Sequence, residues 1–169
     1  MSHPDISLRA LEPEDLDLLY QVENDRSLWN FGPTNVPYSR YLLHVYIATS
    51  KADIHADGQV RLVVLNGVGD TVGLADITNY DAKNCRAEVG IVVLSDYRRR
   101  HFALETLRQL ADYARSVLHL HQLYAVIGSS NLPSQMLFKK AGYETVTVLD
   151  DWLYDGKDYH SAVLMQLFL

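Results

Sequence analysis

The sequence has a single cysteine, Cys85, among its 169 residues. One cysteine cannot form an internal disulfide or supply a cysteine-based zinc site, so we expect a reducing, cytoplasmic compartment. No apolar run reaches the roughly 18 residues that a membrane helix requires. The N-terminal segment lacks a basic stretch followed by an apolar one, so we also expect no secretory signal peptide and no membrane partner.

Positive charge is scarce as well. The chain carries 15 Lys and Arg against 21 Asp and Glu, which gives a net charge of -6. An acidic chain argues against a general nucleic-acid binder, because such proteins neutralise phosphates with basic residues. The local exception is the run Arg98–Arg100 followed by His101. Length and an ordinary globular composition predict a single domain over residues 1–169.

Hydrophobic spacing predicts alternating strands and helices. Helices are expected over residues 13–25, 39–49, 103–118 and 133–141. Strands are expected over residues 6–11, 60–65, 71–80, 87–94, 122–127, 146–152 and 160–167. This order predicts an α/β (α+β) fold in which helices flank a mixed, mostly antiparallel sheet. The strand–helix–strand portion over residues 87–127 predicts two parallel neighbours in that sheet.

The segment between the strand at 87–94 and the next helix is unusually basic. A helix N-terminus carries unpaired N–H groups and partial positive charge, so arginines there are unfavourable unless an anion binds. Arg98, Arg99, Arg100 and His101 lie at such a position, which predicts a phosphate site. The alternative is a solvated turn whose arginines pair with Asp96 or with other acids.

Three segments resemble the GNAT superfamily of N-acyltransferases. Residues 98–103, RRRHFA, stand where the family has Gln/Arg-x-x-Gly-x-Gly/Ala. Residues 120–144, LHQLYAVIGSSNLPSQMLFKKAGYE, resemble the fifth strand and following helix of the family. Residues 8–25 resemble its first strand and helix, so the similarity covers nearly the whole chain. The branch that it resembles is that of the ribosomal-protein N-terminal and spermidine acetyltransferases.

The resemblance implies an acetyl-CoA-dependent N-acetyltransferase in which a primary amine attacks the thioester directly. It implies that the two parallel strands separate and that the pantetheine arm pairs with the backbone of Ile91, Val92, Val93 and Leu94. The pyrophosphate is then expected on the N–H groups of Arg98, Arg99, Arg100, His101, Phe102 and Ala103. Asn131 and Ser134 are expected to contact the pantetheine and Phe138 to pack near the thioester, with no metal involved.

The sequence departs from the family pattern at positions that matter for binding and chemistry. Arg99 and His101 occupy positions that are often glycine, which permits close backbone approach. We expect the site to survive if residue 101 keeps a negative φ and its side chain points away. Phe138 stands where relatives often have a tyrosine that protonates the leaving thiolate. These departures keep a second hypothesis open, a non-catalytic acyl-CoA-binding module of the same fold.

Glu88 is the candidate general base, because some relatives place a catalytic glutamate at the start of this strand. A carboxylate can take the proton that an attacking amine must lose. The structural alternative is a strand residue in a salt bridge with Arg86 or Arg61.

The acyl acceptor is open: a small amine, a polyamine, an aminoglycoside and a protein N-terminus all fit the same donor site. In relatives the region of residues 29–32 and 38–41 borders the acceptor site. Acidic residues in the last predicted hairpin would attract a cationic acceptor: Asp150, Asp151, Asp155 and Asp158. Dimers are common in the family, so a homodimer is open too.

Overall fold

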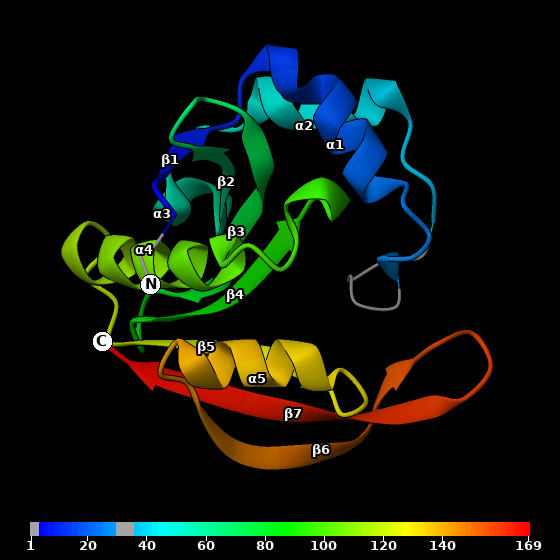
Figure 1. Ribbon diagram of the computed structural model, residues 1–169, viewed down its shortest axis with the longest axis vertical. Helices are drawn as coiled ribbons and strands as arrows, with labels where there is room; N and C mark the ends of the chain where they lie inside the picture. The colour runs from blue at the N-terminus through cyan, green and yellow to red at the C-terminus, as the bar shows by residue number, and fades with distance from the viewer. Residues whose placement is uncertain (1–3, 30–35) are drawn as a thin grey trace.

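A seven-stranded sheet forms the centre of the computed structural model, which describes residues 4–29 and 36–169 (Figure 1). Its strands are β1 (Ile6–Ala10), β2 (Val60–Asn66), β3 (Thr71–Asp81), β4 (Arg86–Val93), β5 (Gln122–Gly128), β6 (Glu144–Tyr154) and β7 (Tyr159–Phe168). They lie in the order β1-β2-β3-β4-β5-β7-β6. Neighbours are antiparallel except for β4 and β5, which are parallel. The predicted mixed sheet and its one parallel pair are confirmed.

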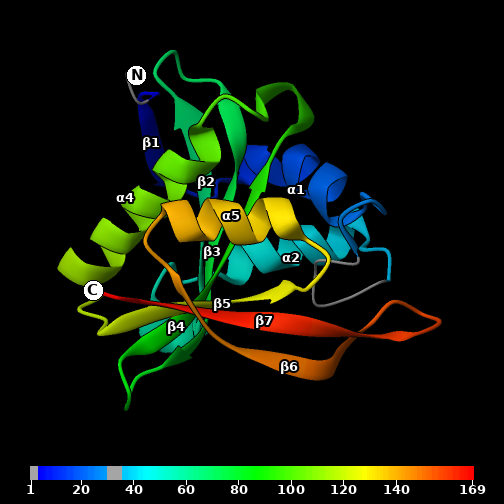
Figure 2. The same ribbon diagram turned by 60° about the horizontal axis from the view of Figure 1, so that its bottom comes forward.

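Helices cover both faces of the sheet (Figure 2). They are α1 (Leu16–Glu23), α2 (Arg40–Thr49), α3 (Ile54–Asp57), α4 (Phe102–Ser116) and α5 (Leu132–Lys140). On one face, α4 and α5 bury an apolar cluster that includes Leu110 and Phe138. On the other face, α1 and α2 bury a second cluster that includes Leu19 and Leu43. Each face of the sheet therefore has its own core.

Strand alternation decides which side chains of β4 face which layer. Ala87 and Val89 belong to the cluster under α4 and α5, and Val92 packs against the cluster under α1 and α2. Successive side chains in a strand point to opposite faces. Glu88 and Gly90 therefore lie on the α1 and α2 face of the sheet.

Most predicted elements are present, with shifts at their ends. The helix predicted over residues 103–118 ends earlier, because α4 stops at Ser116. The short helix α3 was not predicted, although Asp53 caps its start and Gly58 ends it with a left-handed φ of 67°. Residues 30–35 lie outside the described residues. They include residues 30–32 of the region that borders the acceptor site in relatives. Within the described chain, no helix combines the length and hydrophobicity needed to cross a membrane.

The Asp15 side chain links β1 to the helical segment that follows it through hydrogen bonds. Its carboxylate accepts two bonds from the Arg9 guanidinium, at 2.6 and 2.8 Å, and one from the Glu12 N–H at 2.8 Å. The bonds from Arg9 hold the pKa of Asp15 below its usual value, although burial opposes them. A carboxyl whose pKa is lowered by folding stabilises the protein above its unfolded pKa, and this stabilisation is lost as pH falls through the folded pKa.

We therefore expect Asp15→Asn to lower the free energy of unfolding at neutral pH by about 1.5–3 kcal/mol, the range for hydrogen bonds to charged groups. The two proteins should converge as pH falls through the lowered pKa of Asp15 in the folded protein, because the wild-type carboxyl is then protonated as well. Urea unfolding at neutral pH and through this acidic range measures this. The matched control is Asp17→Asn, since Asp17 pairs with Arg40 but is 82% exposed. An equal loss in both variants would contradict the prediction.

Candidate active site

Strands β4 and β5 pair only at their beginnings and then separate. Their parallel register joins residues 86–88 to residues 122–124. Beyond that point β4 stays paired with β3, and β5 stays paired with β7. Residues 89–93 and 125–128 thus face each other without a hydrogen-bond ladder, and the strands run apart in Figure 1. An extended molecule with amide groups can add to such a strand edge.

The turn after β4 enters α4 through two residues with left-handed backbone, Arg99 (φ 61°) and His101 (φ 65°). His101 is the N-cap residue, and no side chain caps the helix. The first bond of the helix runs from the Glu105 N–H to the His101 carbonyl, at 3.2 Å. The N–H groups of residues 102–104 therefore have no acceptor within the described chain. A helix N-terminus in this state binds anions such as phosphate.

The condition stated for the site, a negative φ at residue 101, is not met, because His101 has a φ of 65°. A left-handed conformation costs a residue other than glycine roughly 1–2 kcal/mol. Bonds at the start of the turn help to fix it: the Leu94 N–H donates to the Val72 carbonyl at 2.9 Å, and the Tyr97 N–H donates to the Leu94 carbonyl at 3.0 Å. The backbone path that glycine normally provides is thus kept at positions 99 and 101, although neither residue is glycine.

The three arginines of the turn differ in their contacts. Arg98 donates from Nε to the Val93 carbonyl at 3.0 Å, and the Arg100 guanidinium lies 5.9 Å from the centre of the Tyr97 ring. No ion pair joins residues 98–100 to an acid anywhere in residues 4–29 and 36–169. Arg98, Arg99 and Arg100 are exposed, so the solvated-turn alternative stays open, and only its salt bridges are absent from the described chain. The cluster retains its positive charge next to the start of α4.

On the other side of the divergence, α5 begins at Asn131, whose side-chain oxygen accepts from the Ser134 N–H at 3.2 Å. Asn131 is therefore a helix cap, and its pantetheine contact stays a prediction. Phe138 is 3% exposed and packs edge-on against Tyr143, with ring centres 4.9 Å apart. Burial raises the pKa of the Tyr143 phenol, and its oxygen has no hydrogen-bond partner in the described chain. Both rings belong to the core.

Glu88 lies at the last position where β4 and β5 still pair, opposite Tyr124. Its Oε2 accepts from Nδ2 of Asn79 at 2.7 Å. The salt bridges expected as the alternative are absent from the described chain, because Arg86 pairs with Asp81 at 3.1 Å and Arg61 pairs elsewhere. The candidate base is thus held by a neutral amide.

Asn79 and Tyr124 were not predicted to belong to this site. Burial, followed by the charge of Glu88, raises the pKa of the Tyr124 phenol. The sequence did carry one signal for Asn79, since asparagine is depleted in strands and tolerates left-handed backbone. Pairing between Asn79 and Glu88 depends on the strand register, which the hydrophobic pattern alone leaves undetermined.

Arg61 forms a half-buried ion-pair network on the same face of the sheet. It donates to Asp76 at 2.6 and 3.1 Å and also pairs with Glu23 of α1. Burial alone would lower the pKa of Arg61, but Asp76 and Glu23 raise it above its ordinary value. Glu88 lies on the next strand, β4. This region therefore holds the carboxylates of Glu23, Asp76 and Glu88 against the guanidinium of Arg61, which leaves an excess of negative charge.

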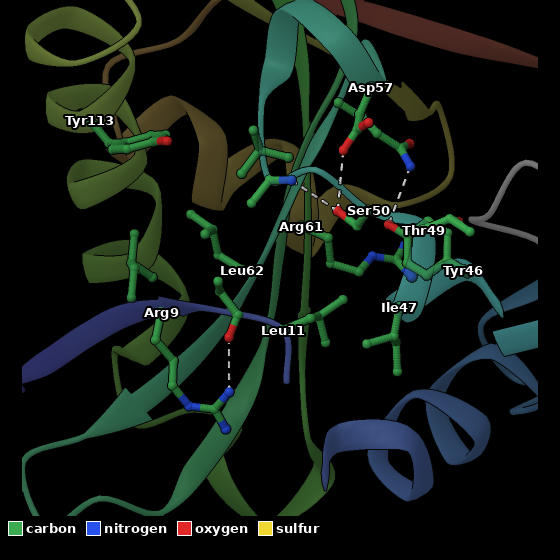
Figure 3. Close-up of a pocket in the computed structure, with 15 residues that line it drawn as sticks. Arg9, Leu11, Tyr46, Ile47, Thr49, Ser50, Asp57, Arg61, Leu62 and Tyr113 are labelled. Carbon is green, nitrogen blue, oxygen red and sulfur yellow. Dashed lines mark hydrogen bonds between the residues drawn. The ribbon is translucent and has the colours of Figure 1, made fainter. Parts of the chain in front are cut away.

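A cavity of about 500 Å³ lies at the edge of the sheet, between α2, α3 and α4 (Figure 3). Arg9, Tyr46, Asp57, Arg61 and Tyr113 are among the residues that line it. Its charged groups are already paired or hydrogen-bonded within the protein. None of the residues predicted to bind acetyl-CoA lines it, so this cavity is distinct from the divergence of β4 and β5.

Comparisons with known proteins agree with this geometry. A family model described as an acetyltransferase (GNAT) domain matches residues 5–144. The chain is 26% identical over 165 residues to spermidine N(1)-acetyltransferase of Escherichia coli (strain K12), covering 96% of this chain and 86% of that protein. It is 33% identical over 70 residues to an N-alpha-acetyltransferase of Sulfurisphaera tokodaii, covering 41% of this chain and 42% of that protein.

Among solved structures, the crystal structure of spermidine N-acetyltransferase from Vibrio cholerae in complex with CoA and spermine superposes with a TM-score of 0.85. That match has 23% sequence identity and covers 97% of this chain and 95% of the other. Similarity at this level of identity shows a shared fold. The fold expected from the resemblance is therefore confirmed.

Proposed function

The chain belongs to the GNAT acetyltransferase family, and we propose that it acetylates a polyamine-like primary amine at the divergence of β4 and β5. The protein is an acetyl-CoA-dependent N-acetyltransferase. The observation that best supports this placement of the site is the left-handed backbone at Arg99 and His101. Side chains disfavour that conformation, and it leaves an uncapped helix N-terminus next to unpaired arginines.

The residues of this site match the parts of acetyl-CoA. The N–H groups at residues 99–103 and the arginine charges would hold the diphosphate. The Arg98 N–H, also predicted for this role, instead donates to the Ser95 carbonyl at 3.3 Å. The backbone of residues 91–94, at the end of β4, would pair with the pantetheine amides as an added strand. Within it, the Val93 carbonyl already accepts from Nε of Arg98. Asn131 and Ser134 would border the pantetheine from the start of α5. Phe138, also predicted to pack near the thioester, lies in the core and is 3% exposed. Acetyl-CoA supplies the acetyl group as an activated thioester.

Glu88 is the proposed general base. An amine must be neutral to attack a carbonyl carbon, and most amines are protonated at neutral pH. Glu88 would take the proton directly or through a water molecule. Phe138 has no proton to donate, and the Tyr143 phenol is enclosed in the core. We therefore propose that the thiolate leaves without a proton from α5. Positioning of the two substrates would supply most of the remaining rate acceleration.

The charge distribution favours a cationic acceptor. The face of the sheet that carries Glu88 also carries Glu23 and Asp76 against the single guanidinium of Arg61. The net charge of -6 further attracts a polycation. The E. coli relative is named for spermidine, which supports a polyamine. The archaeal relative is named as an N-alpha-acetyltransferase, so a peptide N-terminus is the second candidate. A homodimer stays a prediction that sedimentation analysis tests.

Two measurements test the proposal. In thermal unfolding with acetyl-CoA, ligand at 100 times Kd should add about 2.7 kcal/mol of stability. No shift at millimolar ligand would contradict acetyl-CoA binding. Release of free thiol is then followed with spermidine, spermine, a monoamine, an aminoglycoside and a peptide N-terminus. We expect the highest kcat/KM with a polyamine. Binding without thiol release from any amine would instead favour the non-catalytic module.

Arg98→Ala and Arg100→Ala are expected to raise the KM for acetyl-CoA about tenfold each, corresponding to about 1.4 kcal/mol for a lost charged contact to phosphate. The KM for the amine should change little, because the acceptor lies at the other end of the donor. Steady-state kinetics with each substrate varied in turn measures this. Arg115→Ala is the matched control, since Arg115 lies in the last turn of α4 and pairs with Asp112. An equal effect in the control would contradict phosphate binding by the turn.

A further inference from the structure

Strand β3 contains one more residue than β4 where the two strands reach Glu88. Thr78 pairs with Glu88 and Asp81 pairs with Arg86, so two residues of β3 oppose one residue of β4. This is a β-bulge, a feature that redirects side chains and occurs often beside active sites. The second bulged residue, Tyr80, is tied to α3 instead of β4: its N–H donates to the Gly58 carbonyl at 3.3 Å.

The first bulged residue, Asn79, has a left-handed φ of 50°. Its side-chain amide donates from Nδ2 to Oε2 of Glu88 at 2.7 Å. Asparagine tolerates this backbone better than most residues, because its short polar side chain can hydrogen-bond nearby. The bulge therefore turns the Asn79 amide toward the carboxylate, whereas a regular strand residue would alternate between the two faces.

The charged groups near Glu88 pair with other residues, so the hydrogen-bond partner of its side chain is the neutral amide of Asn79. Arg86 is two residues away on β4 and pairs with Asp81 of β3. Arg61 of β2 pairs with Asp76 and Glu23. From β5, Tyr124 faces Glu88 across the last parallel pair. A carboxylate bonded to a neutral amide is a stronger base than one paired with a guanidinium. Oε1 of Glu88 has no hydrogen-bond partner in the described chain.

We propose that Asn79 is a positioning residue that holds the Glu88 carboxylate beside Tyr124, where β4 and β5 diverge. This inference rests on the proposed role of Glu88 as the base. Asn79 fixes Oε2, and Oε1 accepts the proton. As the nitrogen of the amine bonds to the acetyl carbon, its proton passes to Oε1. The bond between that carbon and sulfur breaks, and its electron pair leaves with the thiolate.

Asn79→Gly tests this, because glycine keeps the left-handed φ without strain and removes the amide. We expect kcat/KM for the amine to fall about tenfold, as a misplaced catalytic group does, while the KM for acetyl-CoA stays unchanged. Asn79→Asp replaces the donating amide with a carboxylate of the same length, so kcat/KM for the amine should fall at least as much. A purely structural role would not separate kcat/KM for the amine from the KM for acetyl-CoA in this way.

Asn84→Gly is the matched control, because the Asn84 amide donates to Asp81 in the same hairpin and does not touch Glu88. It should leave kcat/KM for the amine unchanged. In an Asn79→Gly/Glu88→Gln double variant, kcat/KM should equal that of Glu88→Gln alone. If Glu88→Gln is impaired but Asn79→Gly and Asn79→Asp keep the wild-type kcat/KM for the amine, the positioning role is overturned. If Glu88→Gln itself is fully active, the proposed base is wrong.

Discussion

Glu88→Gln is expected to lower kcat by about 10²- to 10⁴-fold, the range that general acid–base catalysis contributes. The carboxylate is the group proposed to take the proton of the attacking amine, and an amide cannot do so. The limb of the pH profile in which kcat rises as the base loses its proton should flatten for the same reason. The KM for acetyl-CoA should stay near its wild-type value, since the proposed diphosphate site lies at the turn before α4.

Glu88→Gln should have little effect on the stability of the fold. Glu88 is half-buried and makes one hydrogen bond, as an acceptor from Asn79. A glutamine oxygen can accept the same bond, so the unfolding temperature should change little. Glu144→Gln, at the exposed start of β6, is the control for loss of a negative charge. Full activity of Glu88→Gln across the pH range would make Glu88 a structural residue, and the amine proton would then pass to another acceptor.

The fold could be predicted because its elements have strong local patterns. The apolar stripe of α4 has helical spacing, and the runs that became β2, β3 and β4 are separated by short turns. The parallel pairing of β4 and β5 follows from the helix between them, which is long enough for a crossover. The helix α3 was missed because four residues are too few to show a periodic pattern.

The sequence predicted the details of the site less well than it predicted the fold. Local preference opposes a left-handed backbone at Arg99 and His101, so only the surrounding structure can impose it. The partner of Glu88 depends on a one-residue bulge, and a shift of one residue in a strand moves every side chain to the other face. Family resemblance indicated the segment, but it could not give the φ of a residue that departs from the family pattern.

The left-handed turn itself can be tested by a pair of substitutions at His101. Proline fixes φ near -65° and removes the N–H group, and it restricts the preceding residue to extended backbone. His101→Pro should therefore weaken acetyl-CoA binding by at least about 100-fold, corresponding to about 2.7 kcal/mol. His101→Gly should keep binding, because glycine adopts a positive φ freely, and should relieve about 1 kcal/mol of strain.

Calorimetric titration with CoA measures both affinities, and thermal unfolding without ligand measures the effect on the fold. The His101 N–H donates to no acceptor in the described chain, so proline removes no internal bond, and α4 should still form from Phe102 onward. Weak binding in both variants would indicate that the imidazole itself contacts the ligand. Wild-type affinity in His101→Pro would place the diphosphate elsewhere. Loss with proline and retention with glycine would attribute binding to the backbone at residue 101, its left-handed conformation together with its N–H group, and not to the imidazole.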